Sequence, residues 1–212
     1  MKYDKEGWQC FVQISEDKVI KKIKTKEEMF DSIRRYLEAN NQLDELEEKV
    51  DKINLSTINS LRIIQKSKIP KKYLANASIK ENLIEQDRIM PLGDKIIELI
   101  KYRDEKEAKK LIEHLIDFII TLWKYKIHEN TYKFYSCYGI DKNNDIVLID
   151  FLEITDDKEK VTKQIMDKKW DKPKRYFGKI DEKISDYFIE LTNRRLTLNT
   201  LERNWGAEQN DR

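Results

Sequence analysis

The stretch from Asp145 to Thr155, DIVLIDFLEIT, decides the fold. Its first part, Ile146 to Ile149, is apolar and β-branched and is bounded by polar turn residues, a pattern typical of a buried strand. Asp150 follows this strand directly. Because a carboxylate at the end of a buried strand is costly unless it meets a cation or strong donors, we expect Asp150 to point into a site. The alternative is that Asp150 caps an ordinary turn.

The composition describes a protein with one large domain or two small lobes. The chain has 212 residues, and 42 Lys and Arg nearly balance 40 Asp and Glu, which leaves a net charge of +2. This balance gives no general argument for binding nucleic acid or a membrane surface. Two cysteines and two histidines, far apart, argue against a zinc site. Without a signal-like N-terminus or a long apolar window, we expect a cytoplasmic protein with no membrane segment.

The N-terminal part is predicted to be strands followed by helices. Residues 8–14 and 19–24 have the aromatic and β-branched character of strands. Thr25 looks like the N-cap of a helix that ends at Asn40-Asn41, and a second helix follows over about 43–53. After Pro70 the pattern predicts a hairpin formed by residues 73–79 and 83–90.

The C-terminal part is predicted to be mainly helical. Pro91-Leu92-Gly93-Asp94 is the clearest break in the chain. Beyond this break we expect, in chain order, a short helix at 96–100, a long helix at 108–126, a hairpin around loop 141–145, and helices from Lys158 on with interruptions at Pro173 and Gly178.

Asp150-Phe151-Leu152 resembles the Asp-Phe-Gly motif of protein kinases, with Leu152 in place of the glycine. In kinases this aspartate follows a strand and holds the magnesium ion of bound ATP. The order of predicted elements is also similar to that of a kinase. The resemblance therefore implies a two-lobed α+β fold, with a small strand-rich N-lobe at 1–90 and a mostly helical C-lobe at 94–212.

Val19 to Ile23 resembles the kinase strand whose lysine reaches the phosphates of ATP. Lys21 is the preferred candidate because it shares a strand face with Val19, and Lys22 is the alternative. The resemblance also implies a glutamate on the following helix that pairs with this lysine. Glu28 and Glu38 are both candidates, and their spacing does not decide between them.

His128-Glu129-Asn130 resembles the kinase catalytic loop without its aspartate. The resemblance implies that Glu129 takes the role of that aspartate and receives the proton of an acceptor hydroxyl. Cys137 stands in place of the metal-binding asparagine, and a thiol is a poor ligand for magnesium. His128 is predicted to be a packing residue at a helix end.

The resemblance implies ATP and Mg²⁺ as cofactors, with Asp150 and Glu153 as metal ligands. Much of the kinase pattern is absent: Gly7 stands alone near the N-terminus, and no Ala-Pro-Glu segment follows Asp150. Because catalytic residues act as a unit, loss of both the aspartate and the asparagine favours a pseudokinase, a binding or regulatory module with a protein partner. Similarly reduced kinase-like proteins occur in bacteria and bacteriophages. The alternative is an atypical phosphotransferase acting on a protein or a small molecule.

The segment 158–179 supports a third hypothesis. It is rich in lysine and also contains Trp170, Tyr176 and Phe177. Cations interleaved with aromatic rings suit nucleic-acid phosphates and stacked bases. A solvated face, or a surface that docks an acidic protein, explains the same pattern.

Overall fold

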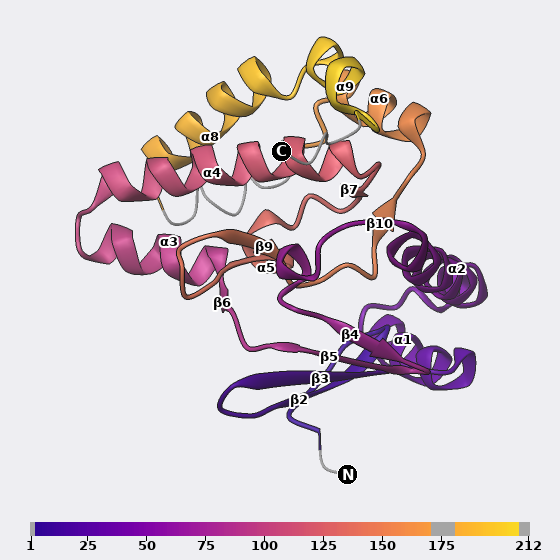
Figure 1. Ribbon diagram of the computed structural model, residues 1–212. Coiled ribbons are helices and arrows are strands. Elements are labelled where there is room, and N and C mark those ends of the chain that lie inside the picture. The colour runs from indigo at the N-terminus through magenta and orange to yellow at the C-terminus, as the bar shows by residue number, and fades with distance from the viewer. Residues whose placement is uncertain (1–2, 171–180, 208–212) are drawn as a thin grey trace.

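The computed structural model describes residues 3–170 and 181–207 and has an α+β fold. Its largest sheet has five antiparallel strands in the order β1-β2-β3-β5-β4 (Figure 1). These strands are β1 (Lys5–Glu6), β2 (Cys10–Ile14), β3 (Lys18–Ile23), β4 (Ser78–Lys80) and β5 (Leu83–Asp87). Strand β3 lies in the middle of the sheet, between β2 and β5.

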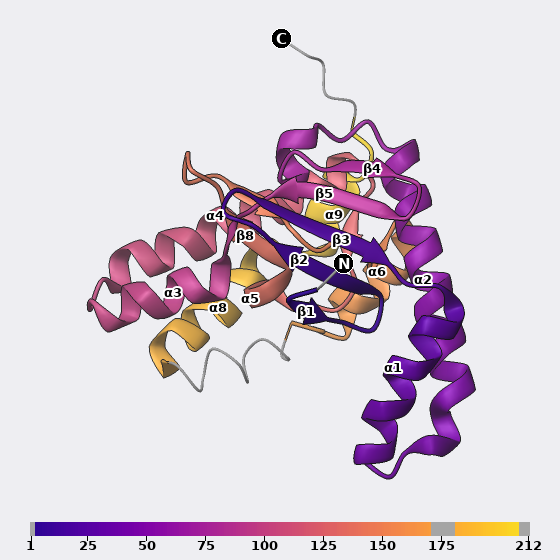
Figure 2. The same cartoon turned by 90° about the horizontal axis from the view of Figure 1, so that it is seen from below.

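Two long helices, α1 (Lys26–Ala39) and α2 (Leu46–Lys66), separate β3 from β4 in the sequence and lie side by side at one end of the sheet (Figure 2). Thr25 caps α1 as predicted, because its hydroxyl accepts from the amide of Glu28 and the Glu28 carboxylate accepts from the amide of Thr25. The helices share a small apolar core of their own, formed by Met29, Ile33, Leu37, Leu46, Val50 and Ile53. A short 3-10 helix, η1 (Leu43–Glu45), joins them.

The predicted hairpin at 73–79 and 83–90 is shorter in the structure. Only β4 and β5 form it, with Ile79 opposite Ile84. Residues before β4 form a 3-10 helix, η2 (Lys71–Leu74), and Ala75 and Asn76 then take positive φ angles of 52° and 54°. A strand cannot pass through two left-handed residues, so the extended segment begins only at Ser78.

The rest of the described chain is mainly helical. Its elements are β6 (Met90–Pro91), α3 (Leu92–Lys101), α4 (Glu105–Lys124), β7 (His128–Glu129), α5 (Phe134–Cys137), β8 (Tyr138–Ile140), β9 (Ile146–Leu148), β10 (Ile154–Thr155), α6 (Lys158–Met166), α8 (Glu182–Arg195) and α9 (Leu198–Asn204). The predicted hairpin around 141–145 is confirmed, because β8 and β9 pair with Tyr138 opposite Leu148. Pro173 and Gly178 lie outside the described residues.

One apolar core joins the five-stranded sheet to the helices. It contains Ile84 from the sheet, Leu115 and Trp123 from α4, Leu148 from β9, and Phe188 from α8. The β9 strand is buried along its whole length, as its sequence predicts. Asp150 therefore follows a fixed strand, between the sheet and the helices. Within residues 3–170 and 181–207, no helix is both long and apolar enough to cross a membrane.

Candidate functional site

Lys21 and Asp150 meet where β3 faces the end of β9. The Lys21 ammonium donates to the carbonyl of Ile149 at 2.8 Å and lies 3.6 Å from Oδ1 of Asp150. The Lys21 side chain is only 12% exposed, whereas that of Asp150 is 42% exposed. Lys21 is thus the buried member of the ion pair, and Asp150 is the solvent-exposed member. The pair links the sheet to the segment that follows β9.

Two glutamines hold the same segment from the sheet. Gln86 of β5 donates its side-chain amide to the carbonyl of Ile149 at 3.0 Å. Gln9, between β1 and β2, donates to the carbonyl of Leu152 at 3.0 Å and to the hydroxyl of Thr57 at 3.0 Å. Since Lys21 also donates to Ile149, this carbonyl receives two side-chain donors from neighbouring strands.

Cys137 positions Asp150 from the opposite side. Its carbonyl accepts from the amide of Ile149 at 2.8 Å and from that of Asp150 at 3.1 Å. Burial raises the pKa of the Cys137 thiol, and the charges of Glu129 and Asp150 raise it further. A neutral, buried thiol is not a magnesium ligand, so Cys137 contributes its backbone to this site.

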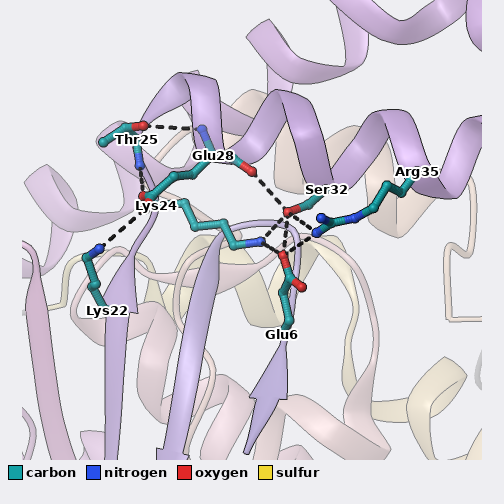
Figure 3. Close-up of polar contacts among 7 residues, drawn as sticks. All are labelled: Glu6, Lys22, Lys24, Thr25, Glu28, Ser32 and Arg35. Carbon is teal, nitrogen blue, oxygen red and sulfur yellow. Dashed lines mark hydrogen bonds and ion pairs between the residues drawn. The ribbon is translucent and has the colours of Figure 1, made fainter. Parts of the chain in front are cut away.

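Lys22 and Lys24 lie on the other face of the sheet and contact α1 (Figure 3). Lys22 lies 3.3 Å from Glu28, one of the two glutamates proposed to pair with the phosphate-binding lysine. The other, Glu38, is exposed and lies 3.9 Å from Arg34 on its own helix. The structure therefore brings neither glutamate to Lys21, because side chains alternate along β3 and α1 faces the opposite set.

The Lys24 network fastens α1 to the sheet (Figure 3). The Lys24 side chain is fully buried, and its ammonium lies 2.6 Å from Oε1 of Glu6 and against the hydroxyl of Ser32. The same Glu6 oxygen accepts from Ser32 and from Arg35, each at 2.7 Å. The hydrogen bond donated by the Lys24 ammonium is the largest of the effects that lower the pKa of Glu6. The role of Lys24 is therefore structural, because its contacts hold α1 against the sheet.

His128 is a buried packing residue, as predicted. The indole N–H of Trp123 donates to Nδ1 of His128 at 3.0 Å, so Nε2 carries the proton and donates to the Tyr132 hydroxyl at 3.0 Å. Burial, with a smaller contribution from the charge of Lys160, lowers the pKa of His128 to about 3. The imidazole is therefore neutral at physiological pH.

Glu129 is also buried, with no exposed surface. Its Oε1 accepts from the amide of Thr131 at 2.7 Å and from the Thr131 hydroxyl, whereas Oε2 has no partner. Burial raises the pKa of Glu129 to about 7, against the smaller lowering effect of Thr131. In this position the carboxyl group cannot touch an acceptor hydroxyl unless the loop moves.

Glu153, the other predicted metal ligand, contacts Lys133 and Asn130. Its carboxylate lies 3.0 Å from the Lys133 ammonium, and its carbonyl accepts from the amide of Asn130. Across the described residues, no group of three or more His, Cys, Asp or Glu side chains is arranged to hold a metal ion. Asp150 supplies one carboxylate, the smallest number that a protein usually provides to magnesium together with substrate phosphates.

A cleft of about 770 Å³ lies beside the loop that follows β7. Residues from the β1–β2 loop, η1, α2, the 129–131 loop, the segment before β10 and α6 line it: Trp8, Glu45, Glu48, Lys49, Lys52, Ile53, Ser56, Asn130, Thr131, Glu153, Lys160 and Gln164. Its lining has both signs of charge, and one buried acceptor, Oδ1 of Asn130, has no hydrogen-bond partner. Neither Lys21 nor Asp150 lines this cleft.

The basic segment 158–179 is described only as far as residue 170. Trp170 is buried, and its indole N–H donates to Asn193 at 3.2 Å, so this ring has no face free for a nucleic-acid base. Lys158 lies 2.6 Å from Glu202, and Lys169 lies 3.5 Å from Asp167. Tyr176 and Phe177 lie outside the described residues.

Comparison of the chain with models of protein families, with curated proteins and with solved structures found no match.

Several residues of the site were not predicted from the sequence: Gln9, Gln86 and Thr131. Gln86 had one available signal, since it alternates with Ile84 on β5 and so falls on the inward face of that strand.

Proposed function

We propose that this chain is a kinase-like protein without phosphotransfer activity, a binding or regulatory module that acts on a protein partner. Its sheet and its helical part correspond to the N-lobe at 1–90 and the C-lobe at 94–212 of a two-lobed kinase-like fold. Lys21 and Asp150 stand at the positions that hold ATP phosphates and magnesium in an active kinase. The absence of a membrane-spanning helix among the described residues is compatible with action in the cytoplasm.

The burial of Glu129 carries this proposal. A general base must come within hydrogen-bonding distance of the proton that it accepts. Glu129 is the carboxyl group in the expected catalytic loop, yet it is fully buried and bonded to Thr131. The loop therefore lacks an exposed carboxylate that could orient an acceptor.

In this proposal, Lys21 and Asp150 form an ion pair with each other and do not bind ATP and magnesium. Lys21 directs its bonds to Ile149 and Asp150, and Gln86 binds the same carbonyl. These contacts hold the segment after β9 against the sheet and so fix the two lobes relative to each other. A rigid arrangement of this kind suits a protein that presents a constant surface to a partner.

A phosphotransfer assay tests the proposal. Purified protein is incubated with γ-labelled ATP and Mg²⁺, and both labelled phosphate release and self-labelling are measured. We expect neither to exceed the rate of the Asp150→Asn variant. Turnover that is lost on Asp150→Asn and on Lys21→Met, but retained on Lys22→Met, would overturn the proposal. Lys22 is the matched control because it lies next to Lys21 but on the other face of β3.

The second candidate function is an atypical phosphotransferase that uses ATP and Mg²⁺. One observation favours it: the approach of Lys21 to Asp150, 3.6 Å, brings together the cation and the carboxylate that such an enzyme uses on phosphate and metal. This candidate requires the 129–131 loop to rearrange on substrate binding. Turnover in the same assay, with the same dependence on Asp150, would establish it.

A further inference from the structure

The C-terminal half of α2 and the residues after it carry an unbalanced positive charge. No Asp or Glu lies between Asp51 and Glu81, although 40 of the 212 residues of the chain are acidic. Arg62, Lys66 and Lys68 fall within this stretch, and all three are exposed. Within the described part of the chain, none of them forms an ion pair.

The acidic residues of neighbouring segments do not cancel this charge. Asp51, one helical turn before Leu55, lies 2.6 Å from the Lys26 ammonium. Asp156 and Asp157 follow β10, which packs against α2. The Asp157 carboxylate accepts from two backbone amides at the start of α6, where the helix dipole offsets its charge. Asp156 is then one carboxylate against three cations.

Two exposed apolar side chains lie on the same helix as these cations. Leu55 is 59% exposed and Ile58 is 55% exposed. Residues three and four apart share a face of a helix, so a stripe of four exposed side chains runs along the outside of α2. This α2 stripe is formed by Leu55, Ile58, Arg62 and Lys66. Both Figure 1 and Figure 2 show α2 at the outer edge of the molecule.

An acidic and partly apolar segment of another protein matches the α2 stripe. Carboxylates of such a segment complement Arg62 and Lys66, and its apolar side chains cover Leu55 and Ile58. The stripe extends over about three helical turns, a length that a second helix matches with its own repeat. We infer that the α2 stripe binds an acidic amphipathic helix of a protein partner. This inference rests on the proposed function, because it supplies the surface on which a binding module holds its partner.

Nucleic acid and membranes match the α2 stripe less well. Leucine and isoleucine make no favourable contact with a phosphate backbone, and the stripe contains no aromatic ring on which a base could stack. A helix that lies in a membrane buries its main apolar face in the lipid. The main apolar face of α2, which includes Val50, Ile53 and Ile64, is already buried in the protein.

Fluorescence anisotropy with a labelled synthetic peptide tests the α2 stripe. The probe has about 15 residues, with leucine on one face of a helix and glutamate on the other. We expect saturable binding that weakens about tenfold when the salt concentration rises from about 50 mM to about 500 mM. The same peptide with serine in place of leucine should bind more weakly, because it cannot cover the apolar half of the stripe.

Paired substitutions separate the two halves of the stripe. Arg62→Gln combined with Lys66→Gln should weaken binding about tenfold, and Leu55→Ser combined with Ile58→Ser about fivefold. Lys101→Gln on α3 is the matched control for charge, because Lys101 is also an exposed lysine near a helix end. Met166→Ser on α6 is the control for apolar surface, because Met166 is 68% exposed. Both controls should bind as the wild type does.

Reversing the charge of the stripe gives a result that unfolding cannot imitate. The variant Arg62→Glu with Lys66→Glu should lose the acidic peptide and bind a peptide in which lysine replaces glutamate. Circular dichroism of each variant shows whether it remains folded.

Three results would overturn the inference. They are no binding of the acidic peptide at about 1 mM, equal binding by the wild type and the stripe variants, and tighter stripe-dependent binding of a DNA duplex or of phosphatidylserine vesicles than of the peptide. Phosphotransfer is measured separately. Turnover would overturn the proposed function even if the peptide binds, whereas a failure of the peptide to bind would overturn this inference alone.

Discussion

Replacing Glu129 with glutamine should change how the stability of the protein depends on pH. Burial raises the pKa of Glu129 from 4.5 to about 7. Between these two pH values the folded protein keeps a proton that the unfolded chain releases, so the free energy of unfolding falls as pH rises. The loss is complete above about pH 7 and amounts to about 3 kcal/mol, because each unit of pKa corresponds to about 1.4 kcal/mol.

The glutamine variant lacks this loss because its side chain does not titrate. Its Oε1 can still accept from the amide and hydroxyl of Thr131. His128 contributes in the opposite direction, since its pKa is lowered to about 3 and its contribution to stability is lost as pH falls below 6.5. The histidine is present in both proteins, so its contribution cancels when their free energies of unfolding are subtracted.

Urea unfolding of the wild type and Glu129→Gln at pH 4, 5, 6, 7 and 8 measures this difference. We expect the free energy of unfolding of the variant, minus that of the wild type, to increase by about 3 kcal/mol between pH 4 and pH 8. Glu47→Gln, which changes an exposed carboxyl group on α2, is the control. A difference that stays constant within about 1 kcal/mol across this range would refute the burial argument.

Substitutions at Glu6, Arg35, Thr25 and Gly139 test the packing of the five-stranded sheet, α1 and β8. Glu6→Gln leaves the buried Lys24 ammonium without its carboxylate and should lower the free energy of unfolding, measured by urea titration, by about 3 kcal/mol. Arg35→Gln removes the exposed partner of Glu6 and should lower it by less than about 1 kcal/mol. Thr25→Ala removes the N-cap of α1 and should cost about 1 kcal/mol, while Thr25→Ser should restore most of it. Gly139→Ala places a Cβ 2.8 Å from a backbone carbonyl and should lower the thermal midpoint, with a cost of about 2 kcal/mol. An unchanged midpoint would show that β8 shifts freely.

The elements that the sequence predicts well are those with a local signal. The run from Ile146 to Ile149 has the composition of a buried strand, and its first three residues form β9. Thr25 with Glu28 three residues later predicts the start of α1, and both hydrogen bonds of the capping box are present. The boundary at 91–94 differs slightly, because Pro91 precedes the first residue of α3 and so begins a helix there.

The polar contacts of the site were harder to predict because they join distant residues. Gln9 and Leu152 are 143 residues apart in sequence, and no local pattern relates them. The sequence preference for Lys21 over Lys22 rested on the strand face that Lys21 shares with Val19. In the structure Lys21 contacts Asp150, whereas Lys22 contacts Glu28 on the other face of β3. The choice between Glu28 and Glu38 had no such basis, and neither glutamate lies at Lys21.

The burial of Glu129 could not be predicted from its type. Glutamate is almost never fully buried without a partner, so the residue type at position 129 predicts an exposed carboxylate. The pairing of β7 with β10, with Glu129 opposite Ile154, places this side chain in the interior instead. Two residues of strand are too short to give a periodic signal in the sequence.

The most direct test of the account is calorimetry of ATP binding with and without magnesium, on the wild type, Lys21→Met and Asp150→Asn. If Lys21 and Asp150 only form an ion pair with each other, none of the three proteins should bind ATP at millimolar concentration in a magnesium-dependent manner. The two variants should instead lower the thermal midpoint of the protein, because each breaks the contact between the sheet and the segment after β9. Magnesium-dependent ATP binding by the wild type, abolished by both substitutions, would contradict the account.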